Sequence, residues 1–373
     1  MTDFDNALGH VRAIPPYPPG RPVDAVAREF GLEPSTIVKL ASNENPLGCS
    51  PAAAESVARL SERGNIYPDF ASYDLCRAIA DANHVSPEQV LPGAGSSEII
   101  LLAVRAFLDS TRAAIIPQYA FQSYEGATRS VGAEPIIVPG KGWDVDLEGL
   151  LAAVNDQTHV LFLATPNNPT GTIVGKAALE SFIDRLPDDV LLILDEAYCE
   201  FLEPDTRPDA VALLARRRNM LVMRTFSKIH GLAGLRVGYA LGDPELLQIL
   251  RRLQLPFSIN SVAQAAAVAA LSDSDFAERS RRLNAEERDR LSAALGQRGI
   301  EQVPSQANFI LMNVGNGAKV AQDLMRRGII VRPVGNYGLP EWIRVTIGLP
   351  AENDRFLEAL DDVLAGTPAR EVA

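Results

Sequence analysis

The sequence predicts an α/β fold in which a mainly parallel, doubly wound sheet forms a large domain and a smaller α+β domain follows it. From about residue 50 to residue 270, short apolar runs alternate with longer amphipathic segments. Apolar runs that do not alternate with polar residues are typical of strands buried on both faces of a parallel sheet. A long charged amphipathic segment then precedes further apolar runs, which indicates the second domain.

Turn residues bound each apolar run of the large domain, and the expected strands lie at 113–117, 134–139, 159–166, 189–198, 219–228 and 236–242. Amphipathic segments between them predict helices at 97–108, 176–186 and 243–253. The second domain is expected to begin with a charged helix at 276–299. It continues with the strand-like runs "NFILMNV", "GIIVRPV" and "WIRVTIG", interleaved with one helix around "AKVAQDLMRRG".

The opening stretch through "PPYPPGRP" holds too many prolines for regular structure and is predicted to be an extended arm. A chain of 373 residues also exceeds the size at which single hydrophobic cores stop growing, roughly 250–300 residues. We therefore expect three parts: an N-terminal arm over 1–45 that packs with the small domain, a large domain over 46–272, and a small C-terminal domain over 273–373.

Composition argues against several classes of partner. The 47 acidic and 35 basic side chains leave a net charge of −12, which would repel nucleic acids and anionic membranes. The N-terminal residues lack the pattern of a secretion signal, and no apolar run approaches the roughly 20 residues of a membrane span, so we expect a cytoplasmic protein. The spacing of Cys49, Cys76, Cys199 and the four histidines suits neither a disulfide framework nor a metal site.

Polar residues directly follow several expected strands, and ligands of open parallel sheets bind at that edge. "TPNNPTG", "DEAY" and "TFSK" each come after an apolar run, and "GAGSSE" precedes an expected helix. The separations from Asn168 to Asp195 and from Asp195 to Lys228 are each about one strand-helix unit, so the segments can converge on one cleft. The candidate residues are Gly95, Ser96, Ser97, Asn168, Asp195, Tyr198, Thr225, Ser227, Lys228 and Arg236.

Pyridoxal 5′-phosphate is the ligand whose chemical groups match this set. Lys228 can bond to its aldehyde and carry the substrate's α-proton, and Asp195 can keep its ring nitrogen protonated. Its phenolic oxygen suits Tyr198 and Asn168. Its phosphate suits a helix N-terminus with hydroxyl groups and a guanidinium, supplied by Ser96, Ser97, Thr225, Ser227 and Arg236. A nicotinamide enzyme is disfavoured, because residues 93–98 lack the full dinucleotide fingerprint.

The chain resembles the fold-type I pyridoxal-phosphate aminotransferases, and most closely the histidinol-phosphate aminotransferases. The shared motifs run in order through nearly the whole length: "YPPG", "VKLASNENPLG", "YPD", "TPNNPTG", "DEAY", "TFSKIHGLAGLRVG" and "GIIVRPVGNYGLPEWIRVTIG". The resemblance implies that Lys228 carries the cofactor and that Tyr119 stacks on the cofactor ring. The chain departs from the family at Ser97, where an acidic residue is frequent, and at Ile229 and His230, where alanine and phenylalanine are common.

The resemblance also implies a homodimer with shared active sites. In such a dimer Tyr67 reaches the cofactor phosphate of the neighbouring subunit. Arg344 is expected to hold the substrate α-carboxylate, or in histidinol phosphate the phosphate in its place, and Asn43 and Asn308 match family positions near the substrate. The implied partners are therefore a small-molecule amino donor, an oxo acid and a second copy of the chain.

The implied reaction converts histidinol phosphate and 2-oxoglutarate into imidazole acetol phosphate and glutamate, a step of histidine biosynthesis. The substrate phosphate would be bound by Arg344, Arg332 and Tyr17. An aromatic amino acid aminotransferase is the alternative, because a pocket lined by Tyr17, Tyr119 and Tyr337 would also accept a phenyl or phenol ring. A decarboxylase would keep the same cofactor site and break a different bond. A non-catalytic binding protein is disfavoured, because the cofactor lysine is present.

Overall fold

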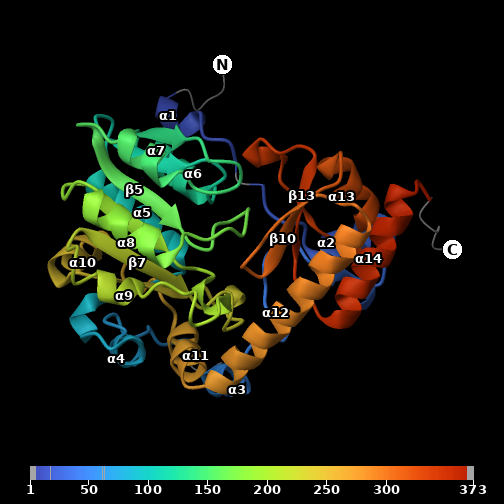
Figure 1. The fold of residues 1–373 in the computed structure, drawn as a ribbon. Helices are drawn as coiled ribbons and strands as arrows, with labels where there is room; N and C mark the ends of the chain where they lie inside the picture. Colours follow the sequence, from blue (N-terminus) through green and yellow to red (C-terminus); the bar gives the residue numbers. More distant parts are fainter. Residues whose placement is uncertain (1–5, 17, 61, 63, 368–373) are drawn as a thin grey trace.

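A seven-stranded sheet is the largest sheet in the described part of the computed structural model, which covers residues 6–16, 18–60, 62 and 64–367 (Figure 1). The strands lie in the order β2-β8-β7-β6-β5-β3-β4, and β8 runs antiparallel to both of its neighbours while the other pairs are parallel. The mainly parallel sheet predicted from the sequence is confirmed. The strands are β2 Val90–Gly93, β3 Ala113–Pro117, β4 Glu134–Val138, β5 Thr158–Ala164, β6 Leu191–Asp195, β7 Met220–Thr225 and β8 Gly238–Gly242.

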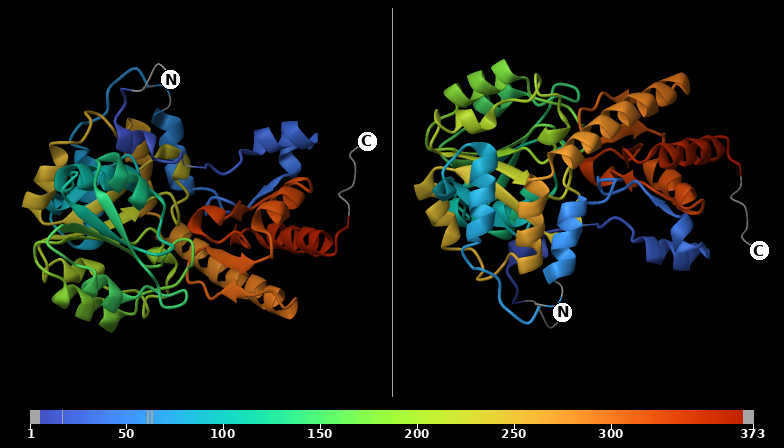
Figure 2. Two further views of the ribbon diagram at one scale, coloured as in Figure 1. Left: turned by 90° about the horizontal axis from the view of Figure 1, so that it is seen from above. Right: turned by 90° about the horizontal axis from the view of Figure 1, so that it is seen from below.

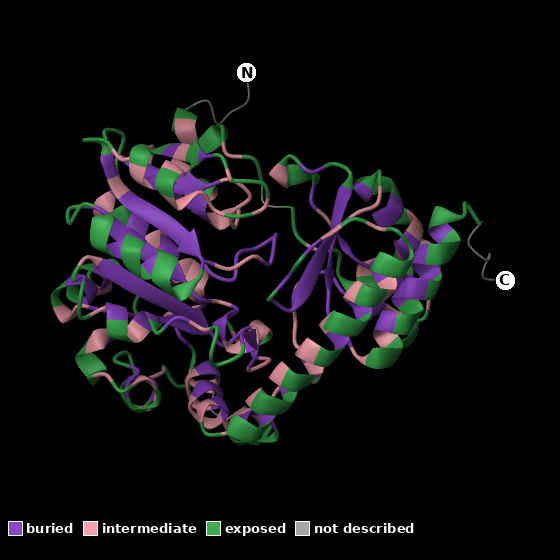
Figure 3. Cartoon of the chain, in the orientation of Figure 1, coloured by how far each residue is buried: buried purple, intermediate pink, exposed green. Residues whose placement is uncertain are grey.

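Helices cover both faces of this sheet, and β5 shows why its sequence is apolar without alternation. Val160 and Phe162 pack into the core on one face, whereas Leu161 and Leu163 pack into the core on the other. One face is covered by α5 Ser96–Phe107, α6 Ser123–Ser130 and α10 Pro244–Arg251. The other is covered by α3 Pro51–Leu60, α4 Tyr73–Asn83, α7 Leu147–Ala152, α8 Lys176–Arg185, α9 Ala210–Leu213 and α11 Ser261–Leu271. Figure 3 shows the buried strands between these partly exposed helices.

A second, four-stranded sheet is antiparallel, in the order β12-β13-β10-β9. Its strands are β9 Gln302–Val303, β10 Phe309–Asn313, β12 Arg332–Pro333 and β13 Trp342–Thr346. Its apolar core is shared with α12 Ser274–Gln297, α13 Gly317–Met325 and α14 Pro350–Leu364. This arrangement agrees with the expected α+β unit. The single strand expected at 328–334 is wrong, because β11 Ile329–Ile330 and β12 pair with different strands.

The N-terminal segment is less extended than the prolines suggested. Two helices form on either side of the proline-rich stretch, α1 Gly9–Arg12 and α2 Val23–Phe30. Strand β1 Val38–Lys39 pairs in parallel with β11, and Val26 of α2 shares an apolar cluster with Ile330. Figure 2 shows α2 beside the helices of the second sheet, whereas α1 lies against α6. The domain limits at 45 and 272 stay a prediction.

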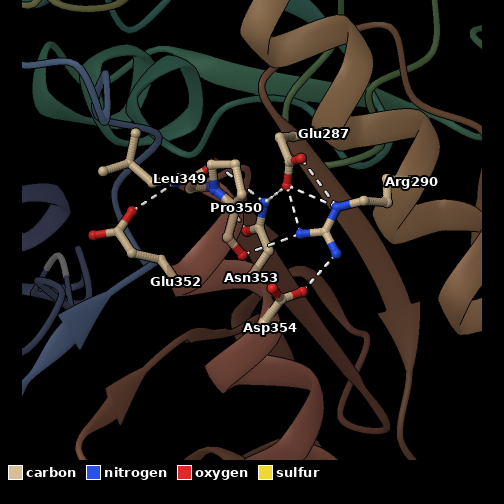
Figure 4. A network of polar contacts seen from close by, with 8 residues as sticks. Glu287, Arg290, Leu349, Pro350, Glu352, Asn353 and Asp354 are labelled. Atoms are coloured by element: carbon tan, nitrogen blue, oxygen red, sulfur yellow. Dashed lines mark hydrogen bonds and ion pairs between the residues drawn. The ribbon is translucent and has the colours of Figure 1, made fainter.

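A polar network centred on the buried side chains of Glu287 and Asn353 joins α12 to the start of α14 (Figure 4). The carboxylate of Glu287 accepts hydrogen bonds from Arg290 and from the side-chain amide of Asn353, at 2.7 Å in each case. Arg290 also pairs with Asp354 at 2.5 Å. A buried carboxylate is tolerated only when donors surround it, and here α12 and α14 supply them together. The network therefore joins two helices that share the apolar core of the second sheet.

Among the described residues, no helix is both long and apolar enough to cross a membrane. The described part of the chain also brings no three His, Cys, Asp or Glu side chains together in a way that could hold a metal ion. Cys76 and Cys199 are buried, Cys49 is half-buried, and none of the three is in a disulfide.

Candidate active site

A cavity lies beyond the carboxyl ends of β5, β6 and β7, and residues of the N-terminal segment and of the second sheet complete its wall. Chain topology explains the position, because parallel strands direct their following loops to the same edge of the sheet. The structure brings most of the predicted site residues to this cavity. They are Asn43, Ser96, Ser97, Asn168, Asp195, Tyr198, Thr225, Ser227, Lys228, Arg236, Arg332 and Arg344.

Lys228 follows β7 and extends into the cavity. Its ammonium nitrogen donates a hydrogen bond to the backbone oxygen of Ser42 at 3.1 Å and lies 5.7 Å from the centre of the Tyr198 ring. Burial, assisted by the positive charge of Arg344, lowers the pKa of Lys228 to about 7. A substantial fraction of the side chain is therefore a neutral amine near neutral pH, which is the form that attacks carbonyl carbon.

Asp195 is the last residue of β6 and is buried at the floor of the cavity. The hydroxyl of Tyr124 donates to its Oδ2 at 2.6 Å, and the backbone N–H of Ala197 donates to its Oδ1 at 3.0 Å. Burial raises the pKa of Asp195 to about 6, and these two hydrogen bonds oppose the rise. The carboxyl group is therefore largely ionised at neutral pH although it is shielded from water.

Tyr198 is held by a hydrogen bond from the side-chain amide of Asn43 to its hydroxyl, at 3.0 Å. Burial raises the pKa of Tyr198 to about 12, so it carries its proton at neutral pH. Asn308 donates from its amide to the backbone oxygen of Asn43 at 3.1 Å and does not line the cavity. Asn308 thus holds the backbone of Asn43 in place and does not itself face the cavity.

An anion-binding corner lies at the start of α5. Ser96 and Ser97 are the first two residues of this helix, where backbone N–H groups have no partner within the helix. Gly95 precedes them with φ of +76°, and a Cβ there would lie 2.4 Å from Nη2 of Arg236. Thr225 donates to the hydroxyl of Ser227 at 3.0 Å on the same side of the cavity. The absence of a side chain at Gly95 thus leaves room for the Arg236 guanidinium.

Two buried arginines face the cavity from the second sheet. Arg332 of β12 and Arg344 of β13 are register partners, so their side chains leave neighbouring positions. Arg344 donates hydrogen bonds to the backbone oxygen of Ala41 at 2.9 Å and to the side-chain oxygen of Asn168. Its guanidinium carbon lies 5.2 Å from the centre of the Phe309 ring. Two guanidinium groups in one cavity wall suit an anionic ligand.

Several predicted residues are not brought to the cavity. Tyr119 does not line it, and its ring centre packs 5.5 Å from that of Trp143. Its backbone φ of +59° turns the chain, and the ring of Phe121 lines the cavity instead. Tyr67 lies on the surface with 79% exposure and stacks on Phe257 at 4.6 Å. Tyr17 lies outside the described residues.

Phe121 and Tyr124 are the site residues that sequence reasoning missed. Both line the cavity, and they sit three positions apart around the start of α6. The run of aromatic residues in "PQYAFQSY" signals an aromatic contact with the ligand but does not distinguish which ring makes it. His230, by contrast, does not line the cavity and packs 5.1 Å from the Phe226 ring, and Ile229 is buried near Tyr198.

The chain is similar to known proteins over nearly its whole length. The model of the family "Aminotransferase class I and II" matches residues 35–360. Histidinol-phosphate aminotransferase 2 of Pseudomonas aeruginosa is 49% identical over 98% of this chain and 100% of its own length. Histidinol-phosphate aminotransferase 1 of Cupriavidus pinatubonensis is 47% identical over 95% of this chain and 96% of its own.

A solved structure extends the likeness to three dimensions. The crystal structure of histidinol-phosphate aminotransferase from Sinorhizobium meliloti, in complex with pyridoxal-5′-phosphate, superposes with a TM-score of 0.90 and 29% identity, covering 98% of this chain and 99% of that one. These matches confirm the fold class and the aminotransferase activity predicted from the sequence. The chain belongs to the class I and II aminotransferases.

Proposed function

We propose that the protein is a histidinol-phosphate aminotransferase that transfers the amino group of histidinol phosphate to 2-oxoglutarate, giving imidazole acetol phosphate and glutamate. The observation that carries this proposal is the pair Arg332 and Arg344, two buried guanidinium groups in the same cavity as Lys228. A phosphate dianion gains more from two such groups than a neutral ring does. The names of the relatives from P. aeruginosa and C. pinatubonensis support the same substrate.

Pyridoxal 5′-phosphate fits the chemistry of the cavity. A lysine amine, a buried carboxylate and a helix N-terminus with hydroxyl groups lie together, and each matches one group of this cofactor. When bound, the cofactor supplies a reactive carbonyl and a ring that withdraws electrons from the substrate's α-carbon. Ser96, Ser97, Ser227 and Arg236 would hold its phosphate, and Phe121 would cover its ring.

Lys228 performs two tasks in the proposed reaction. As a neutral amine it would hold the cofactor through its aldehyde, with release of water, and once free again the same nitrogen would accept and return the α-proton of the substrate. Its pKa of about 7 suits both tasks, because the nitrogen can hold or release a proton near neutral pH. The nearby Tyr198 accepts a hydrogen bond from Asn43, and neither side chain carries a charge at neutral pH.

Asp195 stabilises positive charge on the ring nitrogen of the cofactor. A carboxylate that is shielded from water favours a protonated pyridine strongly, because the surrounding dielectric constant is low. Its ionised state at neutral pH, with a pKa of about 6, is therefore essential to the proposed role. Asn168 would contact the phenolic oxygen while it accepts its hydrogen bond from Arg344.

Direct turnover measurements distinguish the proposed reaction from its alternatives. The purified enzyme should convert histidinol phosphate and 2-oxoglutarate to imidazole acetol phosphate and glutamate. Its kcat/KM for histidinol phosphate should be higher than its kcat/KM for phenylalanine or tyrosine. Release of carbon dioxide from an amino acid would indicate a decarboxylase instead. The aromatic alternative loses one supporting residue, since Tyr337 lines the cavity but Tyr119 does not.

The proposed assembly is a homodimer in which Tyr67 completes the neighbouring site. Tyr67, Phe70, Leu255 and Phe257 form an exposed apolar cluster, which we call the Tyr67 patch. Exposed aromatic residues gathered in this way are typical of protein interfaces. Two-fold symmetry would place the same patch on both subunits.

A biosynthetic enzyme of this kind is expected to work in the cytoplasm.

A further inference from the structure

The hydroxyl of Tyr124 makes a short hydrogen bond to the carboxylate that faces the cavity. Its oxygen lies 2.6 Å from Oδ2 of Asp195, and both side chains are buried, with exposures of 0% and 6%. Among the described residues, the other donor to this carboxylate is the backbone N–H of Ala197, at 3.0 Å on Oδ1. Tyr124 therefore supplies one of two protein donors to a buried anion. Hydrogen bonds between a hydroxyl and a carboxylate at this distance are among the stronger ones in proteins.

The surroundings of Tyr124 hold its ring in one orientation. The ring stacks on Phe162 of β5 with a centroid distance of 4.5 Å and an interplanar angle of 9°, and it meets the edge of Phe121 at 5.7 Å and 87°. Its backbone oxygen accepts a hydrogen bond from the hydroxyl of Thr128 one turn later in α6, at 2.8 Å. The phenol is thus directed at Asp195 by packing of its ring against two other aromatic rings.

The geometry points to Tyr124 as a positioning residue that keeps the Asp195 carboxylate ionised and correctly oriented toward the ring nitrogen of the cofactor. This inference rests on the proposed role of Asp195. Each carboxylate oxygen receives one protein donor, and each keeps lone-pair capacity for a further partner. Loss of the phenol would leave Oδ2 of a buried carboxylate without its protein donor, which favours the protonated acid.

Acid-base properties of the pair agree with this role. Burial and the nearby Asp195 charge raise the pKa of Tyr124 well above its usual range, so the phenol keeps its proton and acts as the donor. The hydrogen bond from Tyr124 is the largest influence that opposes the burial-driven rise in the pKa of Asp195. A phenylalanine at 124 would preserve both ring contacts and remove the donor alone.

A comparison of two cofactors separates this role from a structural one. The full-length enzyme is stripped of cofactor and reloaded with pyridoxal 5′-phosphate or with its analogue in which carbon replaces the ring nitrogen, and the dissociation constants are measured by equilibrium dialysis. For Tyr124→Phe we expect binding of pyridoxal phosphate to weaken by about tenfold, the loss typical of a hydrogen bond to a charged group. Binding of the nitrogen-free analogue should not change, because the effect acts through the ring nitrogen.

Tyr239→Phe is the matched control, since this buried phenol accepts hydrogen bonds from the amide of Asn83, at 3.4 Å, and from Arg224, and lies outside the cavity. We expect it to leave both dissociation constants unchanged. Equal weakening of both cofactors by Tyr124→Phe would show a merely structural role, and no weakening of either would show no role; each result overturns the inference.

Asp195→Asn in the same assay distinguishes the two levels of the argument. If Asp195 faces the ring nitrogen, this variant should lose most of the preference for pyridoxal phosphate over the analogue. If that preference is unaffected, the proposed role of Asp195 fails and the Tyr124 inference fails with it. If Asp195→Asn removes the preference and Tyr124→Phe does not, only the inference about Tyr124 is wrong.

Discussion

Arg344 of β13 donates a hydrogen bond to the side-chain oxygen of Asn168, which follows β5, although 176 positions separate the two residues in the chain. The contact joins the second sheet to the carboxyl edge of the main sheet. It also fixes the direction of a guanidinium that the cavity exposes to ligand. The arginine proposed to bind substrate is therefore positioned by a residue proposed to contact the cofactor.

Replacement of Arg344 by alanine should lower kcat/KM for the amino donor by about a hundredfold, the range expected for losing hydrogen bonds to a charged group. The variant would lose the anion contact and leave Asn168 and the Ala41 backbone oxygen without this donor. Steady-state kinetics with histidinol phosphate checks the prediction. The control is Arg355→Ala, an exposed arginine of α14, which should retain parental kinetics. Similar kcat/KM values for the two variants would contradict the role of Arg344.

Covalent attachment of the cofactor should depend on pH in a way set by Lys228. Because its pKa is lowered from 10.5 to about 7, the neutral amine increases as pH rises through about 7 and is nearly complete well below pH 10. Stopped-flow absorbance after adding pyridoxal phosphate to the cofactor-free enzyme should therefore give a rate that rises with a midpoint near pH 7 and then levels off.

Two variants sharpen that measurement. Lys228→Ala should fold and show no lysine-bound cofactor band at any pH. Arg344→Ala removes a positive charge that contributes to the low pKa of Lys228, so the midpoint should move to higher pH. A rate that continues to rise up to pH 10 in the parent enzyme would show that the pKa of Lys228 is not lowered. A retained visible band in Lys228→Ala would show that another lysine carries the cofactor.

Gly95→Ala should weaken cofactor binding by displacing Arg236, because the new Cβ would lie 2.4 Å from Nη2 of that side chain. We expect about tenfold weaker binding of pyridoxal phosphate, from the lost contact of a guanidinium with a phosphate. Pyridoxal without the phosphate should bind both forms alike. Gly142→Ala is the control, since Gly142 has a similar φ of +65° and no atom within 4 Å of the added Cβ. Equal effects of both variants on both ligands would point to backbone strain alone.

Mixing two inactive variants tests the shared site. Lys228→Ala subunits retain Tyr67, and Tyr67→Ala subunits retain Lys228, so a heterodimer would contain one complete site. Random exchange forms heterodimers in half of the dimers, and we expect about a quarter of parental activity. Two preparations of Lys228→Ala should give no activity on mixing. Absence of recovery after mass spectrometry has verified subunit exchange would argue against a site completed across the dimer.

Strands β3, β5, β6, β7 and β8 were predictable because both of their faces are buried over five or more residues. Each residue of β6 is buried, so the apolar run carries no alternation and its limits stand out between turn residues. Strand β2 and helix α11 were not predicted. The sequence of β2 is only four residues long, "VLPG", and α11 is rich in alanine with little contrast between its faces, so neither has a distinctive period.

Site residues at or just after the carboxyl end of a strand were predictable. Asp195 and Lys228 lie at the carboxyl edge of neighbouring strands, and topology alone brings them together. Tyr119 shows the limit of such reasoning, because it does not line the cavity and has a positive φ that no residue pattern signals. The hydrogen bond from Tyr124 to Asp195 spans 71 positions and arises from tertiary packing, so no local pattern reveals it.

The most direct test of the substrate assignment is the ratio of kcat/KM for histidinol phosphate to kcat/KM for phenylalanine, measured in the parent enzyme and in Arg332→Ala. Arg332 is buried beside Arg344 in the cavity wall, where a second guanidinium benefits a phosphate far more than a ring. We predict a parent that prefers histidinol phosphate and a ratio that falls about tenfold or more in the variant, with phenylalanine turnover nearly unchanged. A parent enzyme that prefers phenylalanine would contradict the assignment and identify an aromatic aminotransferase.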